Sequence, residues 1–156
     1  MVIYRQENNI SRVEFTGSIT DIWLDLLLDR LWYEEPSLLN KTSYYIKDDI
    51  KKALPIIQKA LQIVYIIETQ TLVKFGGLTA YTHKEGVKEF TILLNMQGRV
   101  EEMELKYFIA NYDYSFLNKL LQYRKQQPNL IAVDISVPNK IVYIDKTTNK
   151  RYEVHV

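Results

Sequence analysis

The chain contains 156 residues, of which 47% are hydrophobic and 25% are charged, as in an ordinary globular protein. It has no Cys, which excludes disulfide bonds, thiolate zinc sites and a cysteine nucleophile. Because 20 Lys and Arg residues stand against 19 Asp and Glu residues, the overall charge does not require a polyanionic partner. The length predicts a single domain, residues 1–156.

The first residues lack a basic stretch followed by an apolar run, and no apolar stretch approaches the ~18 residues of a membrane span. We therefore expect a cytoplasmic protein without a membrane partner. Residues with AT-rich codons, such as Tyr, Ile, Asn and Lys, far outnumber those with GC-rich codons, such as Gly, Ala and Pro. This bias indicates an AT-rich genome, that of a low-GC bacterium, its phages and plasmids, or a large virus.

At the N-terminus, the pattern predicts two strands, residues 2–5 and 10–16, joined by a turn. In the second strand, Val13 and Phe15 alternate with charged residues, which predicts one buried face and one exposed face.

Helical periodicity follows. Ser18 and Asp21 have the spacing that caps a helix, and this helix is expected to end before Pro36. A second helix beginning near Thr42 or Ser43 is expected to break or kink at Pro55, which then opens a short third helix.

Residues 63–67 are β-branched and aromatic, which predicts a central strand, and residues 71–75 are expected to extend it or pair with it. Alternating residues on both sides of Gln97-Gly98 predict a hairpin with Ile92 opposite Met103 and Phe90 opposite Leu105. A helix over residues 100–110 is the competing interpretation of the second arm.

In the remaining third of the chain, the pattern predicts a helix capped by Asp113 or Ser115. Three strands are predicted to follow, at residues 130–137, 141–145 and 151–156. Helices and strands occur in blocks rather than in strict alternation. The predicted class is therefore α+β, with a mainly antiparallel sheet of about seven to nine strands and a single layer of three to four helices packed on it.

The sequence contains no phosphate-binding glycine loop, dinucleotide fingerprint, GxSxG elbow or HExxH motif. No cofactor or metal site is predicted. The weak candidate for catalysis is a glycine-bounded loop, residues 77–86, in which Glu85 could orient His83. The rival interpretation is an ordinary polar loop, and a small hydrolase using His83 is the third functional hypothesis.

The helix that begins after Ser18 carries more apolar surface than one buried face needs. At 100° per residue, apolar side chains occupy more than half of its circumference, whereas an ordinary amphipathic helix has a stripe of a little over ~100°. Either the helix is clamped between the sheet and its neighbour, or its extra face docks another protein or a second copy. The predicted docking residues are Leu24, Leu28 and Trp32, with Asp21, Asp25 and Asp29 as a charged, solvent-facing rim.

The C-terminal part combines basic residues with tyrosines, the pairing that sequence-tolerant nucleic-acid grooves use. The residues of this alternative site are Lys119, Arg124, Lys125, Lys146, Lys150, Arg151, Tyr123, Tyr143 and Tyr152. Lysines at a helix C-terminus or on a terminal strand also have purely structural roles. The favoured hypothesis is a non-enzymatic protein–protein interaction module, such as an inhibitor or immunity-type protein of a mobile element or virus, with a homodimer as one form of the interaction.

Overall fold

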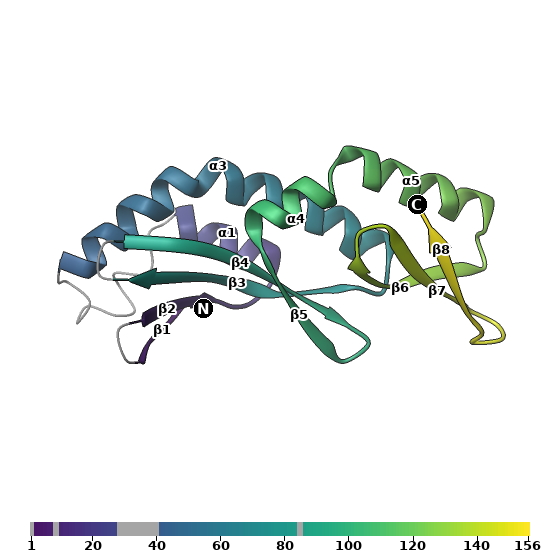
Figure 1. Ribbon diagram of the computed structural model, residues 1–156, viewed down its shortest axis with the longest axis horizontal. Helices are drawn as coiled ribbons and strands as arrows, with labels where there is room; N and C mark the ends of the chain where they lie inside the picture. Colours follow the sequence, from purple (N-terminus) through teal and green to yellow (C-terminus); the bar gives the residue numbers. More distant parts are fainter. Residues whose placement is uncertain (1, 8–9, 28–40, 84–85) are drawn as a thin grey trace.

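Two antiparallel sheets and four helices make up the described part of the chain (Figure 1). The computed structural model describes residues 2–7, 10–27, 41–83 and 86–156, with side chains for residues 12–27, 50–81 and 89–156. The α+β class predicted from the sequence is confirmed. The sequence suggested one main sheet, however, and the strands divide into a sheet of five and a sheet of three.

The five-stranded sheet has the strand order β1-β2-β3-β4-β5, with every neighbouring pair antiparallel. Its strands are β1 (Val2–Glu7), β2 (Ile10–Phe15), β3 (Lys74–His83), β4 (Gly86–Met96) and β5 (Arg99–Glu104). Val13 and Phe15 are buried while their neighbours Arg12 and Glu14 are partly exposed, so the predicted alternation of β2 is confirmed.

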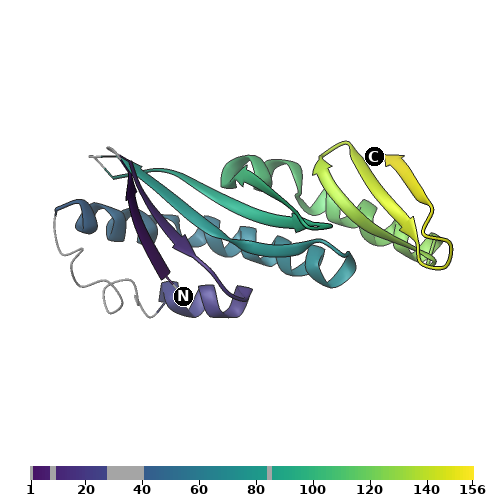
Figure 2. The same cartoon turned by 90° about the horizontal axis from the view of Figure 1, so that it is seen from below.

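Three helices lie along one side of this sheet: α1 (Ile19–Leu27), α3 (Lys41–Gln70) and α4 (Leu105–Asn111) (Figures 1 and 2). No described helix covers the opposite face. Ser18 and Asp21 cap α1 as predicted, because the Asp21 N–H donates to Ser18 Oγ at 3.1 Å and the Ser18 N–H donates to Asp21 Oδ2 at 3.3 Å. None of the described helices is long and apolar enough to cross a membrane.

The long helix α3 corrects two predictions. It continues through Pro55 without ending, and it includes residues 63–67, which were predicted as a strand. The buried residues Ile57, Ala60, Leu61, Val64 and Ile67 follow helical spacing. Packing of this stripe on the sheet therefore outweighs the strand preference of the β-branched residues.

The predicted hairpin is confirmed at its turn. Ile92 pairs with Met103 in register, and Gln97 and Gly98 both have positive φ, as a two-residue hairpin turn requires. The second arm ends at Glu104, however, and Leu105 begins α4, so the pairing of Phe90 with Leu105 was wrong. Leu105 and Phe108 are both buried on α4, because the apolar spacing changes there from two residues to three.

The three-stranded sheet consists of β6 (Leu130–Val137), β7 (Lys140–Asp145) and β8 (Arg151–His155), close to the predicted strands. Helix α5 (Tyr114–Gln126) covers it (Figure 1) and is capped as predicted by Asp113, which accepts from the Phe116 N–H. Buried residues of both sheets belong to one hydrophobic cluster. A backbone hydrogen bond of 2.9 Å, from the N–H of Leu72 between α3 and β3 to the Ala132 carbonyl, also ties β6 to the rest of the fold.

An ion pair connects the two sheets at their edges. Asp134 of β6 accepts from Arg99 Nη2 of β5 at 2.6 Å, and its other oxygen accepts from the N–H and hydroxyl of Ser136 at 2.8 and 2.6 Å. Burial alone would raise the pKa of Asp134, but the Ser136 hydrogen bonds and the Arg99 guanidinium together lower the pKa below its usual value.

This lowered pKa predicts a pH dependence of stability. A carboxylate with a depressed folded-state pKa stabilises the fold above its unfolded pKa of about 3.9 and loses that contribution as the pH falls through the folded value. We expect Asp134→Asn to be less stable than the wild type at neutral pH, with a difference that shrinks below about pH 4. Urea unfolding across this range measures it; a difference that stays constant would contradict the assignment.

Candidate docking groove

Helix α1 exposes apolar side chains in the folded chain, among them Leu24, one of the three predicted docking residues. Leu24 is 40% exposed and Leu27 is 53% exposed, whereas Ile22 and Leu26 on the opposite flank are buried. The buried flank faces the sheet and α3, so these elements cover only part of the apolar circumference. A contiguous apolar surface left open in this way usually marks an interaction site.

A groove of about 560 Å³ lies between α1 and α3. Its walls are Ile19, Thr20, Trp23, Gln58, Leu61, Gln62, Tyr65 and Ile66. None of these eight side chains is charged, and Tyr65 is 61% exposed. Volume and lining resemble those of protein clefts that bind mainly apolar ligands, which span about 300–1,000 Å³.

The spacing of residues along the two helices explains the groove. On α1, Ile19, Trp23 and Leu27 are four residues apart, so Leu27 extends the wall formed by the first two. On α3, Leu61 and Tyr65 repeat the same spacing. Two apolar stripes that meet at an angle leave a trough between them, because their backbones cannot approach more closely than the side chains allow.

The surface of α3 beside the groove is basic. Lys51, Lys52 and Lys59 are exposed, and Lys52 and Lys59 precede Ile66 by whole heptads on the same side of the helix. A ligand with acidic groups along one flank would therefore meet favourable charges while its apolar side fills the groove.

The predicted site is only partly reproduced. Asp25 is 4% exposed, so the prediction that it forms part of a solvent-facing rim was wrong: the covered flank of α1 extends as far as this residue. Asp21 is exposed and caps α1. Leu27, which is not among the predicted docking residues, is exposed. The side chains of Leu28, Asp29 and Trp32 lie outside the described residues.

Sequence reasoning missed the contribution of α3 to the site. Tyr65 and Ile66 were assigned to a strand, and nothing in the local pattern places α3 beside α1. If residues 57–67 had been assigned to a helix, their spacing would have predicted the exposed side of α3. It would not have predicted that α1 lies beside that side.

The basic, tyrosine-containing C-terminal region differs from the prediction at two residues. Tyr143 is 2% exposed and its ring packs against Tyr123, with centroids 4.7 Å apart, so it cannot stack on a base. Burial raises the pKa of Tyr143 to about 12. Arg124 donates to the carbonyl and side-chain oxygens of Gln70 at 3.1 and 2.8 Å, which ties α5 to the end of α3.

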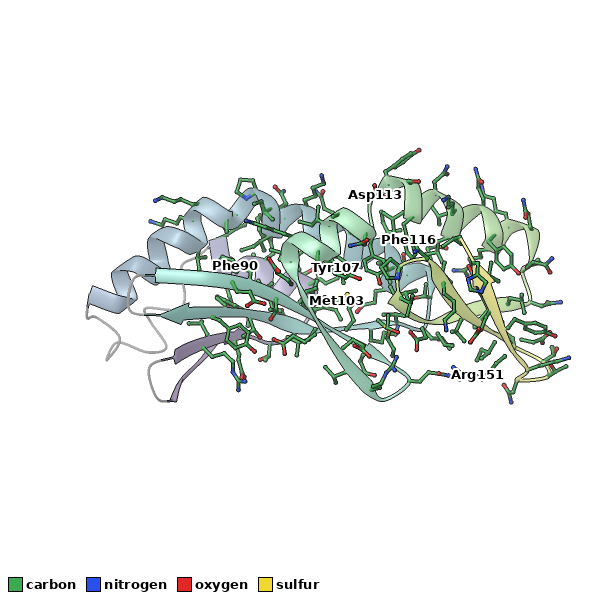
Figure 3. The ribbon with its side chains drawn as sticks, in the orientation of Figure 1. Phe90, Met103, Tyr107, Asp113, Phe116 and Arg151 are labelled. Atoms are coloured by element: carbon green, nitrogen blue, oxygen red, sulfur yellow. The ribbon has the colours of Figure 1, made fainter. Side chains whose placement is uncertain are left out.

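The other members of this region remain accessible. Lys119, Lys125, Lys146 and Lys150 are exposed, and Lys150 lies over the ring of Tyr152 at 5.6 Å. Arg151 extends toward the β4–β5 turn (Figure 3), where it donates to Gln97 Oε1 at 2.9 Å. This bond gives Arg151 a structural role between the two sheets.

The segment predicted as a catalytic loop is mostly strand. Residues 77–83 belong to β3, and His83 pairs in register with Gly86 at the end of the β3–β4 hairpin. The side chain of His83 and the whole of Glu85 lie outside the described residues. Within the described ranges, no three His, Asp or Glu side chains gather as metal ligands.

Neither a protein-family model, nor a curated protein, nor a solved structure matches the chain.

Proposed function

We propose that the chain is a non-enzymatic protein–protein interaction module that binds an amphipathic helix of a partner protein between α1 and α3. The observation that carries the proposal is the uncharged groove of about 560 Å³. Leu27, four residues after the lining residue Trp23 on α1, is 53% exposed beyond this lining. Helix-in-groove recognition uses this kind of surface: the apolar side of one helix fills a hydrophobic trough on another protein.

The charges beside the groove specify the partner helix further. Its apolar stripe has the i, i+3, i+4, i+7 spacing, and Asp or Glu residues flank the stripe on the side that meets Lys52 and Lys59. An inhibitor or immunity-type protein of an AT-rich mobile element or virus is one protein of this class, because it acts by binding another protein.

The test uses a synthetic, fluorescein-labelled helix with leucines at this spacing and glutamates on both flanks. We expect saturable binding, measured by anisotropy, that is weakened at least about tenfold, or ~1.4 kcal/mol, by Leu27→Glu. Leu27 is half exposed, so the variant should fold, which circular dichroism checks. Val137→Glu is the matched control, because Val137 is 47% exposed on β6, outside the groove lining.

Lys59→Glu tests the charge argument separately. It should weaken the acidic helix but not a version with lysine flanks, and added salt should reduce the difference. Equal binding to the wild type and Leu27→Glu would overturn the proposal. A light-scattering mass that doubles with concentration and returns to the monomer value in Leu27→Glu would also overturn it, because the groove would then hold a second copy.

A further inference from the structure

A second, polar hollow lies on the face of the five-stranded sheet that no described helix covers. It encloses about 140 Å³. Four neighbouring strands contribute polar side chains to it or to its edge: Arg12 and Glu14 from β2, Thr79 and Tyr81 from β3, Thr91 from β4 and Glu102 from β5.

The hollow exists because β3 carries a bulge with two consecutive glycines. The register with β4 shifts between Phe75 and Gly77, and both Gly76 and Gly77 line the hollow. Residues at these positions contribute no side chain, so the backbone forms the floor where a regular strand would place bulk. Bulges commonly adjust the surface of a sheet next to a binding site.

The polar groups around the hollow form a connected arrangement. The Tyr81 hydroxyl donates to Glu102 Oε1 at 2.7 Å, and the Thr91 hydroxyl donates to the same oxygen at 3.0 Å. Within the described residues, no hydrogen bond reaches the second carboxylate oxygen of Glu102. Across the hollow, Arg12 Nη2 lies 2.5 Å from Glu14 Oε1.

Thr79 lies at the centre of this arrangement. It is 5% exposed, lines the hollow, and stands in register between Glu14 and Thr91. Its hydroxyl makes no hydrogen bond with any described residue. Thr79 borders the hollow, so its hydroxyl offers an acceptor at the centre that a bound group can use.

The charge of the side chains around the hollow determines whether a cation or an anion is the favoured ligand. Two carboxylates and one guanidinium give a net charge of −1, and the guanidinium interacts with both Glu14 and Tyr81. Burial, together with the hydrogen bond to Glu102 and its charge, raises the pKa of Tyr81 against the opposing effect of Arg12. Tyr81 therefore remains a neutral donor to Glu102, and the lining keeps an excess of one negative charge.

We propose that this hollow binds a primary ammonium group, which donates hydrogen bonds to Glu102 and to the Thr79 hydroxyl. The hollow has the volume of roughly four or five water molecules, enough for an ammonium head with a short alkyl stem. Such a group occurs in a small free amine and at the end of a lysine side chain. The inference is independent of the proposed function, because the hollow and the groove lie on opposite faces of the sheet.

The test is a ¹H–¹⁵N NMR titration of the whole chain with two amines, methylammonium and the amide of Nα-acetyl-lysine. We expect saturable shifts at the amides of Thr79, Tyr81 and Glu102. If only methylammonium produces shifts, the ligand is a small free amine. If both amines produce shifts, the hollow also accepts the ammonium of a lysine side chain. Tetramethylammonium has the same charge without N–H donors and should produce no comparable shifts.

Variants complete the test. Glu102→Gln and Thr79→Val should each weaken methylammonium binding at least about tenfold, because one removes the charge and the other an acceptor. Glu153→Gln is the control, since this exposed acid of β8 lies outside the hollow; Leu27→Glu should also bind normally. Equal shifts with tetramethylammonium, no saturable shift with either amine, or unchanged binding to Glu102→Gln would overturn the proposal.

Discussion

Tyr112→Ala should lower the free energy of unfolding by about 4 kcal/mol, the range found when a large buried aromatic residue is truncated. Tyr112 is fully buried between α4 and α5, where its ring packs on Phe108 and Phe116 with centroids 5.2 and 4.8 Å away. Its hydroxyl donates to the Ile135 carbonyl of β6. One side chain therefore fills the core and holds the three-stranded sheet.

Urea unfolding followed by circular dichroism measures this free energy, and in thermal unfolding we expect the melting temperature to fall by roughly 10 °C. Tyr112→Phe keeps the ring and removes only the hydroxyl, so it should cost about 1–2 kcal/mol. Tyr114→Ala is the control, because Tyr114 is 81% exposed and should change stability by no more than about 0.5 kcal/mol. A loss at Tyr112→Ala as small as the loss at Tyr114→Ala would contradict the packing described above.

Gly77→Ala should also be strongly destabilising, by about 3 kcal/mol. Gly77 has a φ of +129°, a backbone angle that residues other than glycine rarely adopt. An added Cβ would lie 2.9 Å from the Phe15 carbonyl oxygen on β2. The substitution therefore combines an unfavourable dihedral angle with a clash against backbone, which cannot rotate away as a side chain can.

Gly98→Ala separates these two causes. Gly98 also has a positive φ, +85°, but an added Cβ would meet nothing within 4 Å. In the same unfolding experiment, Gly98→Ala should lower the free energy of unfolding only by the cost of the unfavourable dihedral angle, about 1–2 kcal/mol. Equal losses at the two glycines would show that the close approach of β2 and β3 at Gly77 has no energetic consequence.

Several elements of this protein could be predicted because their signals are local. The Gln97-Gly98 turn, the Asp113 cap and the cap formed by Ser18 and Asp21 each depend on atoms within three residues of one another. The last three strands were placed for a similar reason, since short alternating segments separated by turn residues allow few other interpretations.

The excess apolar surface of α1 was also evident in the sequence, because a helix of known periodicity converts residue order directly into angles. The sequence could not decide which side of that circumference the sheet would cover. Asp25 lies on the covered flank and Leu27 outside it, and only the packing of α1 against its neighbours assigns them there.

Tertiary contacts decided the rest. Residues 63–67 have the composition of a strand, but a 30-residue helix gains more by burying a stripe of apolar side chains along its length than five residues gain from their intrinsic preference. Tyr143 was grouped with exposed tyrosines, yet the packing of α5 on β7 buries it. The sequence by itself thus determined the class, the turns and the caps, each set by near neighbours in the chain. The groove of α1 and α3 and the hollow over four strands exist only after folding, since the residues that form each of them are distant in sequence.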